Sequence, residues 1–242
     1  MLIEGRNSVG QALDGNGTVD KVLVFYGLKD EALIAKVKKS GVQYQFVDRP
    51  ALDRVSKTKN HQGIVAFVTD YKYFDIDEVI EDAYRKGEQP IILILDGVED
   101  PHNLGNIIRT AECMGVDGLI LPKNRSVSVN DTAMRVSQGA SSNLQICKVV
   151  NINNEIEKLK RRGFWIYAVE LGGGEIAKVN LRGPIAFILG GEGAGVHQLT
   201  RKLADGIVSI KMRGKINSLN VGSACAMALY EANRQRDAAG SA

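Results

Sequence analysis

The hydrophobic positions of this 242-residue chain alternate between short apolar runs and segments with helical spacing. In the first part of the chain the pattern predicts helices near Ser8–Leu13, Asp30–Lys39 and Leu52–Ser56, and strands at Lys21–Tyr26, Tyr44–Val47 and Ile64–Thr69. We therefore expect a small α/β domain over residues 1–69. Residues 70–89 are polar and charge-rich, with room for one helix at Ile76–Arg85, and are typical of a connector.

The alternation restarts at Pro90 with Ile91–Leu95, a continuous apolar run of the kind found in parallel strands that are buried on both faces. The remaining predicted strands are Gly118–Leu121, Gln145–Val149, Trp165–Val169, Ile185–Leu189 and Ile207–Ile210, and the predicted helices are Leu104–Met114, Thr132–Ser137, Asn154–Arg161, His197–Leu203 and Leu219–Gln235. This alternation predicts a second α/β domain over residues 90–242, with a mostly parallel sheet covered by helices.

Composition narrows the class of protein only a little. A chain with 44% hydrophobic and 24% charged residues is an ordinary globular protein, and a formal charge of +3 permits a nucleic-acid partner without requiring one. Cys113, Cys147 and Cys225 lack CxxC spacing, so we expect no disulfide framework, no metal site and a cytoplasmic location. No apolar run approaches the roughly 18 residues of a membrane span, so no membrane association is expected.

Three polar segments follow predicted strands, at Asp100–Ala111, Leu189–Val196 and Ile210–Val221. Ligands of open α/β sheets bind outside the carboxyl ends of the strands, so the three segments predict one shared site. In the first segment, Asn103 stands where a helix N-cap is expected and Arg109 lies off the apolar stripe. Arg109 either grips a phosphate or is a solvated surface residue, and this segment alone leaves both interpretations open.

The second segment surrounds Glu192 with glycines, which let a ligand approach the backbone or allow positive φ. It does not match the dinucleotide fingerprint GxGxxG, so a nucleotide-dependent oxidoreductase is disfavoured. In the third segment, Lys211, Arg213 and Lys215 form a basic loop that either holds phosphate or is simply solvated. The last helix carries small residues that would let a second helix approach, either from this chain or from a second subunit.

Taken together, the segments resemble the three signature motifs of the SpoU family of RNA ribose 2′-O-methyltransferases. The matching stretches are DPHNLGNIIRTAECMG, ILGGEGAGV and MRGKINSLNV, in the order of the family. The N-terminal stretches IEGRNSVGQAL and HQGIVAFV resemble the small substrate-binding domain of the branch that includes bacterial large-subunit ribosomal RNA guanosine methyltransferases. The resemblance covers nearly the whole chain.

The resemblance implies a C-terminal trefoil knot that binds S-adenosylmethionine, and a homodimer with the site near the subunit interface. It places Asn103, Arg109, Glu192, Ser218 and Asn220 at catalytic positions. The implied cofactor-binding residues are Leu189, Gly190, Gly191, Gly193, Ile210, Met212 and Leu219. Lys211, Arg213 and Lys215 would contact RNA, although Lys211 stands where many relatives have proline.

The implied reaction is methyl transfer from S-adenosylmethionine to a ribose 2′-hydroxyl of structured RNA, with no metal. Ribosomal RNA is the favoured substrate and transfer RNA the alternative. A non-catalytic RNA-binding or ribosome-assembly protein is the competing interpretation. The family proposal makes the arginine, here Arg109, the base. Because a guanidinium is very hard to deprotonate, Arg109 could instead fix the adjacent phosphate while another acceptor or water takes the proton.

Overall fold

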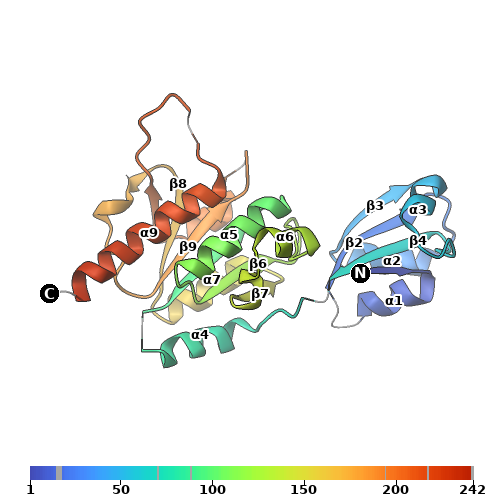
Figure 1. Cartoon of the computed structure of the whole chain (residues 1–242), viewed down its shortest axis with the longest axis horizontal. Coiled ribbons are helices and arrows are strands. Elements are labelled where there is room, and N and C mark those ends of the chain that lie inside the picture. Colours follow the sequence, from blue (N-terminus) through green and yellow to red (C-terminus); the bar gives the residue numbers. More distant parts are fainter. Residues whose placement is uncertain (15–17, 70, 88, 194, 217, 241–242) are drawn as a thin grey trace. The chain divides into compact units, whose positions relative to one another are not determined.

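The computed structural model describes residues 1–14, 18–69, 71–87, 89–193, 195–216 and 218–240. It divides the chain into two compact units, Met1–Lys72 and Tyr73–Ala242 (Figure 1). Each unit has its own sheet, so the fold and the core of each are described separately.

The first unit is built on a four-stranded mixed sheet with the strand order β1-β4-β2-β3. Its elements are β1 (Leu2–Glu4), α1 (Arg6–Asp14), β2 (Thr18–Phe25), α2 (Glu31–Lys39), β3 (Gln43–Val47), α3 (Arg49–Val55) and β4 (Ile64–Thr69). β2 pairs with β3 in parallel, whereas β4 runs antiparallel to both β1 and β2. The hydrophobic pattern did not predict the short strand β1, which adds the antiparallel edge.

Alternation along β2 gives the first unit a core on each face of its sheet. Val22 and Val24 pack with α1 and α2, whereas Leu23 between them packs with Leu52 of α3 and with Val65. Successive side chains of a strand point to opposite faces, so a run of three valine and leucine residues serves both cores.

The second unit contains a six-stranded sheet with the order β10-β8-β9-β5-β6-β7, in which every pairing is parallel. Its strands are β5 (Ile91–Asp96), β6 (Gly118–Pro122), β7 (Gln145–Val149), β8 (Trp165–Glu175), β9 (Ile185–Gly190) and β10 (Gly206–Ser209). Its helices are α4 (Ile76–Arg85), α5 (Pro101–Cys113), α6 (Asp131–Val136), α7 (Ile152–Arg161), α8 (Gln198–Leu203) and α9 (Val221–Gly240), with 3-10 turns at Ala140–Ser142 and Ile176–Lys178.

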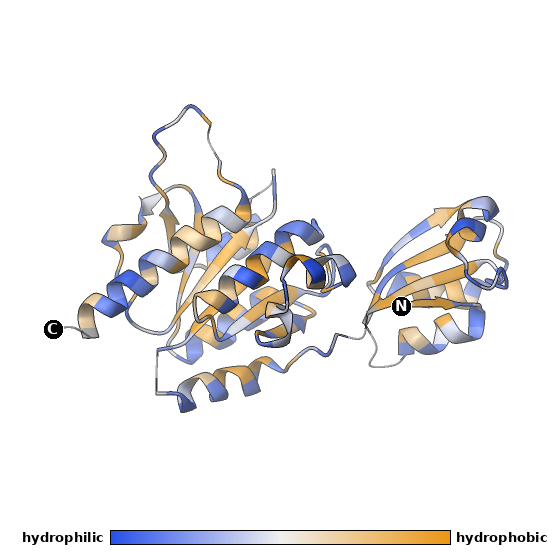
Figure 2. Cartoon of the chain, in the orientation of Figure 1, coloured by the Kyte–Doolittle hydropathy of each residue, from blue (hydrophilic) through white to orange (hydrophobic). Residues whose placement is uncertain are grey.

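Helices cover both faces of this sheet. Every residue of β5 is buried, as the continuous apolar run predicted, and Figure 2 shows the central strands as the most hydrophobic part of the unit. Ile92 and Ile94 pack beneath α4 and α7, whereas α5 and α9 pack against each other across the opposite face (Figure 1). The prediction of an α/β domain with a parallel sheet is confirmed, and the trefoil knot stays a prediction.

The segment expected to be a connector is shorter than the sequence suggested. Ile76, Val79, Ile80 and Ala83 of α4 are buried, and the first three join Ile92 in one core cluster. The interpretation of residues 70–89 as a connector is therefore wrong over α4, because the apolar stripe of this polar-looking helix is covered by the sheet. The helix belongs to the second unit.

Candidate functional site

The three polar segments lie at neighbouring strand ends of the second unit. β9 lies between β8 and β5, and Asp96 at the end of β5 is in register with Gly190 at the end of β9. Parallel strands place their carboxyl ends at one edge of the sheet. The second segment follows β9 directly, the first opens α5 just after β5, and the third joins β10 to α9.

A cavity of about 650 Å³ lies at these strand ends. It is lined by every residue that the resemblance assigned to the cofactor, namely Leu189, Gly190, Gly191, Gly193, Ile210, Met212 and Leu219. Ser218 and Asn220 also line it. Pockets of 300–1,000 Å³ with mainly apolar walls and a few polar groups are typical of small-molecule sites. The structure therefore brings together residues from the second and third segments around one ligand-sized space.

The glycines of this cavity do two different things. A Cβ on Gly190 would lie 2.1 Å from the carbonyl carbon of Gly195, and one on Gly191 would lie 1.9 Å from the carbonyl oxygen of Gly97. These two glycines are required because two backbone segments cross at close range. Gly193 has a φ of +88° with open space around its Cβ position, so the left-handed backbone, and not a close contact, is what favours glycine there.

Asn103, Glu192 and Asn220 form one hydrogen-bonded cluster beside the cavity. Asn103 Nδ2 donates to Glu192 Oε1 at 2.7 Å, and Asn220 Nδ2 donates to Asn103 Oδ1 at 2.8 Å and to Glu192 Oε1 at 3.4 Å. The prediction that Asn103 caps its helix is wrong, because Asp100 is the N-cap and accepts from the amide of His102. Asn103 is instead buried inside the first turn of α5, where its side chain reaches Glu192.

The cavity is also lined by two residues that the sequence interpretation missed, Glu170 and Arg201. Glu170 Oε1 accepts a hydrogen bond from the amide of Val196 at 2.7 Å, and its other oxygen lies 3.3 Å from Arg201 Nε. Glu170 directly follows the predicted strand Trp165–Val169. The strand-end rule that selected the other segments would have selected it too.

A second cavity of about 390 Å³ shares four lining residues with the first, namely Gly191, Glu192, Gly195 and Val221. Its wall includes His197, which lies 2.8 Å from the buried Asp96 through Nδ1 and donates its backbone amide to the same carboxylate at 2.9 Å. Asp96 thus fixes the ring of His197, with Nδ1 as the donor, at the edge of the site. Like Glu170, Asp96 directly follows a predicted strand, Ile91–Leu95, so the strand-end rule would have selected it as well.

The basic residues singled out in the sequence do not join this cluster. Arg109 lies on α5 with an exposed side chain and lines neither cavity. Lys211, Arg213 and Lys215 are exposed on the loop that precedes α9 (Figure 1), and Lys211 borders a separate apolar hollow beside Met227 and Tyr230 of α9. Within one chain, the structure therefore separates Arg109 from the other four residues expected to be catalytic.

The described ranges hold neither a metal-ion cluster nor a membrane-spanning helix. Among those residues, no cluster of three or more His, Cys, Asp or Glu side chains is arranged to hold a metal ion. Over the same part of the chain, no helix has both the length and the apolar character needed to cross a membrane.

The architecture defines a parallel α/β unit with a ligand-sized cavity at its strand ends, preceded by a smaller α/β unit. Comparison with family models then gives the family. Residues 90–230 match the SpoU rRNA Methylase family, and residues 2–74 match the model described as RNA 2′-O ribose methyltransferase substrate binding. The first match covers more than half of the chain, so this chain belongs to the SpoU rRNA methylase family. The resemblance of the three motifs is confirmed.

Similar proteins agree with this assignment. The chain is 36% identical over 241 residues to YacO of Bacillus subtilis, whose name places it among TrmH family tRNA/rRNA methyltransferases, and the match covers 98% of this chain and 96% of YacO. It is also 36% identical over 240 residues to a Synechocystis protein named as an uncharacterized tRNA/rRNA methyltransferase, and the match covers 97% of this chain but only 62% of that longer protein.

A solved structure shares the fold over nearly the full length. The SpoU methyltransferase AviRb from Streptomyces viridochromogenes, crystallised in complex with AdoMet, matches with a TM-score of 0.64 and 24% identity. The match covers 98% of this chain and 91% of AviRb.

Proposed function

We propose that this chain transfers a methyl group from S-adenosylmethionine to a ribose 2′-hydroxyl of structured RNA, with ribosomal RNA as the favoured substrate and transfer RNA as the alternative. One observation carries the proposal. The cavity lined by all the expected cofactor residues lies directly beside the Asn103–Glu192–Asn220 cluster, and Glu192 and Asn220 belong to both. A binding site for a methyl donor and a set of polar groups for the acceptor would therefore adjoin.

The cavity fits the cofactor in size and in chemistry. Its apolar walls, formed by Leu189, Ile210, Met212 and Leu219, suit an adenine ring, and its polar edge suits a ribose and an amino acid group. Glu192 is held by two neutral amides, so its negative charge is not cancelled and favours a cationic ligand. When bound, S-adenosylmethionine would supply an electrophilic methyl group on a sulfonium.

The polar cluster would position the acceptor hydroxyl. The hydrogen bonds from the side-chain amides of Asn103 and Asn220 to Glu192 both end on Oε1. Within the described contacts, Oε2 of Glu192 therefore remains available to accept a hydrogen bond from the ribose hydroxyl. The hydroxyl of Ser218 at the cavity wall is a further group that could bond to the ribose. Holding the hydroxyl in line with the methyl group replaces a bimolecular encounter with a fixed geometry, which is a large part of catalysis in such a displacement. Asn103 and Asn220 would keep the Glu192 carboxylate in place.

Arg109 would complete the site from a second copy of the chain. Its side chain is exposed and lines neither cavity of its own chain. The neighbouring helix α9 exposes Met227 and Tyr230, with Tyr230 62% exposed, which is a suitable apolar face for a dimer. In this arrangement Arg109 of one copy fixes the phosphate next to the ribose that the other copy binds. The active form would be a cytoplasmic homodimer in which a knotted loop holds the cofactor.

The test is methyl transfer by the full chain from labelled S-adenosylmethionine to ribosomal and transfer RNA, followed by digestion and mass analysis of the nucleosides. The expected product is a ribose-methylated nucleoside. Glu192→Gln should lower the rate at saturating cofactor at least about tenfold, because losing one transition-state contact of 1.4 kcal/mol has that effect. Glu157→Gln, the same change at an exposed position of α7, should leave the rate unchanged. Methylation of a base would contradict the proposed acceptor, and RNA binding without transfer would favour the non-catalytic interpretation.

A further inference from the structure

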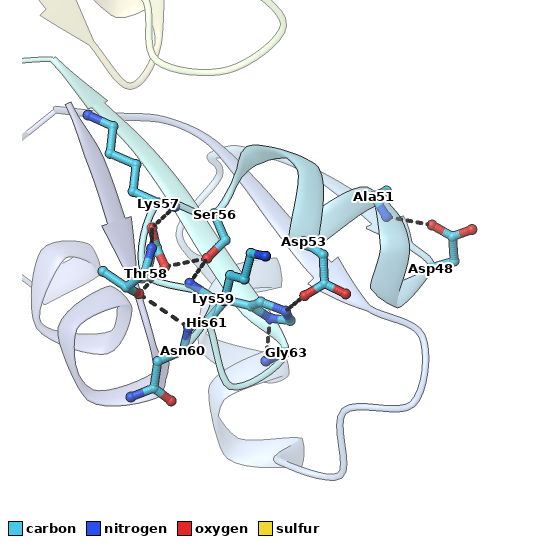
Figure 3. A network of polar contacts seen from close by, with 11 residues as sticks. Asp48, Ala51, Asp53, Ser56, Lys57, Thr58, Lys59, Asn60, His61 and Gly63 are labelled. Carbon is cyan, nitrogen blue, oxygen red and sulfur yellow. Dashed lines mark hydrogen bonds and ion pairs between the residues drawn. The ribbon is translucent and has the colours of Figure 1, made fainter.

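The loop between α3 and β4 of the first unit is held by four hydrogen bonds to one carboxylate (Figure 3). Glu4, at the end of β1, accepts hydrogen bonds from the Ser56 hydroxyl, the Lys57 amide and the Thr58 hydroxyl, each at 2.6 Å, and from the Thr58 amide at 3.4 Å. These bonds hold the pKa of Glu4 near 2, well below its ordinary value, with the Ser56 hydroxyl as the largest cause. Both oxygens of the Glu4 carboxylate therefore accept hydrogen bonds from the loop and fix its conformation.

A buried histidine anchors the other end of the same loop. His61 is 2% exposed, its Nδ1 accepts from the Gly63 amide at 3.0 Å, and its Nε2 lies 3.0 Å from Asp53 Oδ1. Because Nδ1 accepts, the ring proton sits on Nε2 and is donated to Asp53. The Asp53 carboxylate is therefore also engaged by the loop, and the loop is fixed at both ends.

The backbone between these anchors adopts a conformation that costs energy. Lys59 and Gln62 have φ values of 58° and 51°, in the left-handed region that side chains other than glycine rarely occupy. The amide of Lys59 donates to Ser56 Oγ at 2.8 Å and that of Asn60 to Thr58 Oγ1 at 3.2 Å. Strained non-glycine backbone of this kind persists where the surroundings over-determine it, and such positions cluster at functional sites.

The side chains of this loop that take no part in its hydrogen-bond network include two cationic donors, Lys57 and Lys59. Lys57 and Lys59 are exposed, and within the described residues their ammonium groups make no hydrogen bond or ion pair; Figure 3 shows Lys57 pointing away from the network. Arg6 is held at the same place, since its Nε donates to the Gln62 carbonyl at 3.2 Å and its amide to Gln62 Oε1 at 3.1 Å. The carboxylates that contact this loop, Glu4 and Asp53, are already engaged by other groups of the loop. A partner of this surface must therefore supply negatively charged acceptors.

We propose that residues 56–62 form a preorganised RNA-backbone site in which Lys57 and Lys59, supported by Arg6, contact phosphates of the substrate RNA. The proposal rests on the proposed function, which makes RNA the substrate, and adds the segment of the first unit that binds it. Preorganisation matters because a loop already fixed in its bound shape loses little conformational freedom on binding. Glu4 is then a positioning residue that does not touch RNA.

The test compares two double variants of the full chain that remove the same charge from the same unit. Lys57→Ala/Lys59→Ala removes the proposed contacts, and Lys38→Ala/Lys39→Ala removes two exposed lysines of α2. Binding of labelled ribosomal RNA is measured across a salt series. For the first variant the slope of log affinity against log salt should flatten by about 1.4 to 1.8, since each phosphate contact contributes about 0.7 to 0.9. The KM for RNA should rise in step while kcat stays near that of the wild type. The control should keep the wild-type slope.

Glu4→Gln separates preorganisation from charge. It leaves both lysines in place but weakens the acceptor that shapes the loop, so affinity should fall several-fold with an unchanged salt slope. If the wild-type chain methylates RNA and the two double variants have equal salt slopes, the loop site is overturned and the proposed function stands. A wild-type chain that neither binds nor methylates RNA would overturn both. An unchanged affinity in Glu4→Gln would overturn the positioning role of Glu4.

Discussion

Helix α4 can be tested as a structural part of the second unit through one buried side chain. Ile80 is 1% exposed and lies in the same core cluster as Ile92 and Ile120 of the sheet. Truncating a fully buried isoleucine to alanine costs about 2–5 kcal/mol, because the lost transfer free energy adds to that of the cavity left behind. We expect Ile80→Ala to lower the free energy of unfolding of the second unit by this amount. Glu81→Ala, at the adjacent exposed position, should change it by less than about 0.5 kcal/mol.

The assay uses the single tryptophan of the chain. Trp165 begins β8, so its fluorescence during urea unfolding reports the second unit and not the first. Burial of one isoleucine or valine side chain contributes about 1.5–3 kcal/mol, so the three side chains of Ile76, Val79 and Ile80 together contribute about 4.5–9 kcal/mol. This sum is comparable with the whole stability of a typical domain. A chain that starts at Tyr73 should therefore fold, and one that starts at Pro90 should not. Equal unfolding free energies for Ile80→Ala and Glu81→Ala, or a stable fold from Pro90 onward, would refute this reasoning.

Three further outcomes follow from the contacts. Asn103→Ala should reduce kcat about ten- to a hundredfold, because the lost hydrogen bond to the Glu192 carboxylate is worth about 1.5–3 kcal/mol; single-turnover methyl transfer would measure it. The depressed pKa of Glu4, about 2, means that its stabilisation of the first unit is complete above pH 4.5 and is lost as pH falls toward 2, which a loss of hydrogen-exchange protection of the loop amides, relative to their intrinsic exchange rates, would show. Burial raises the pKa of Cys225 to about 12, so alkylation at neutral pH should label exposed Cys113 and spare Cys225.

Local pattern was sufficient for most elements of the fold. The strand Ile64–Thr69 and the helix Ile76–Arg85 have the predicted bounds, and the apolar run at Ile91 lies in the middle of a parallel sheet as expected. These successes share a cause, since periodicity of hydrophobic positions reports which faces are covered. The pattern could not show that α4 is covered by the sheet of the second unit, because a polar composition does not distinguish a connector from an amphipathic surface helix.

The site was only partly predictable, because its contacts join distant residues. Asn103 and Asn220 are 117 positions apart, and neither the N-cap assigned to Asn103 nor the local turn chemistry indicates that they bond to each other. The glycines show the same limit. Gly190 and Gly191 are needed where backbone meets backbone, and the sequence alone allowed a ligand as the reason. By contrast, Asp96 and Glu170 were within reach, since each directly follows a predicted strand.

The position of Arg109 gives the sharpest test of the proposed dimer. Arg109→Ala should abolish methyl transfer and leave cofactor affinity nearly unchanged, because Arg109 does not line the cavity. If Arg109 acts on the site of a second copy, co-expression of Arg109→Ala with Glu192→Gln should restore activity. In a mixed dimer one site then joins an intact Glu192 to an intact Arg109, so random pairing should return roughly one quarter of the wild-type rate. Activity of the mixture above the residual activity of either variant alone requires that the two residues come from different chains. A mixture no more active than its components would show that Arg109 serves its own chain, and helix α5, which carries it, would then have to move to bring it to Glu192.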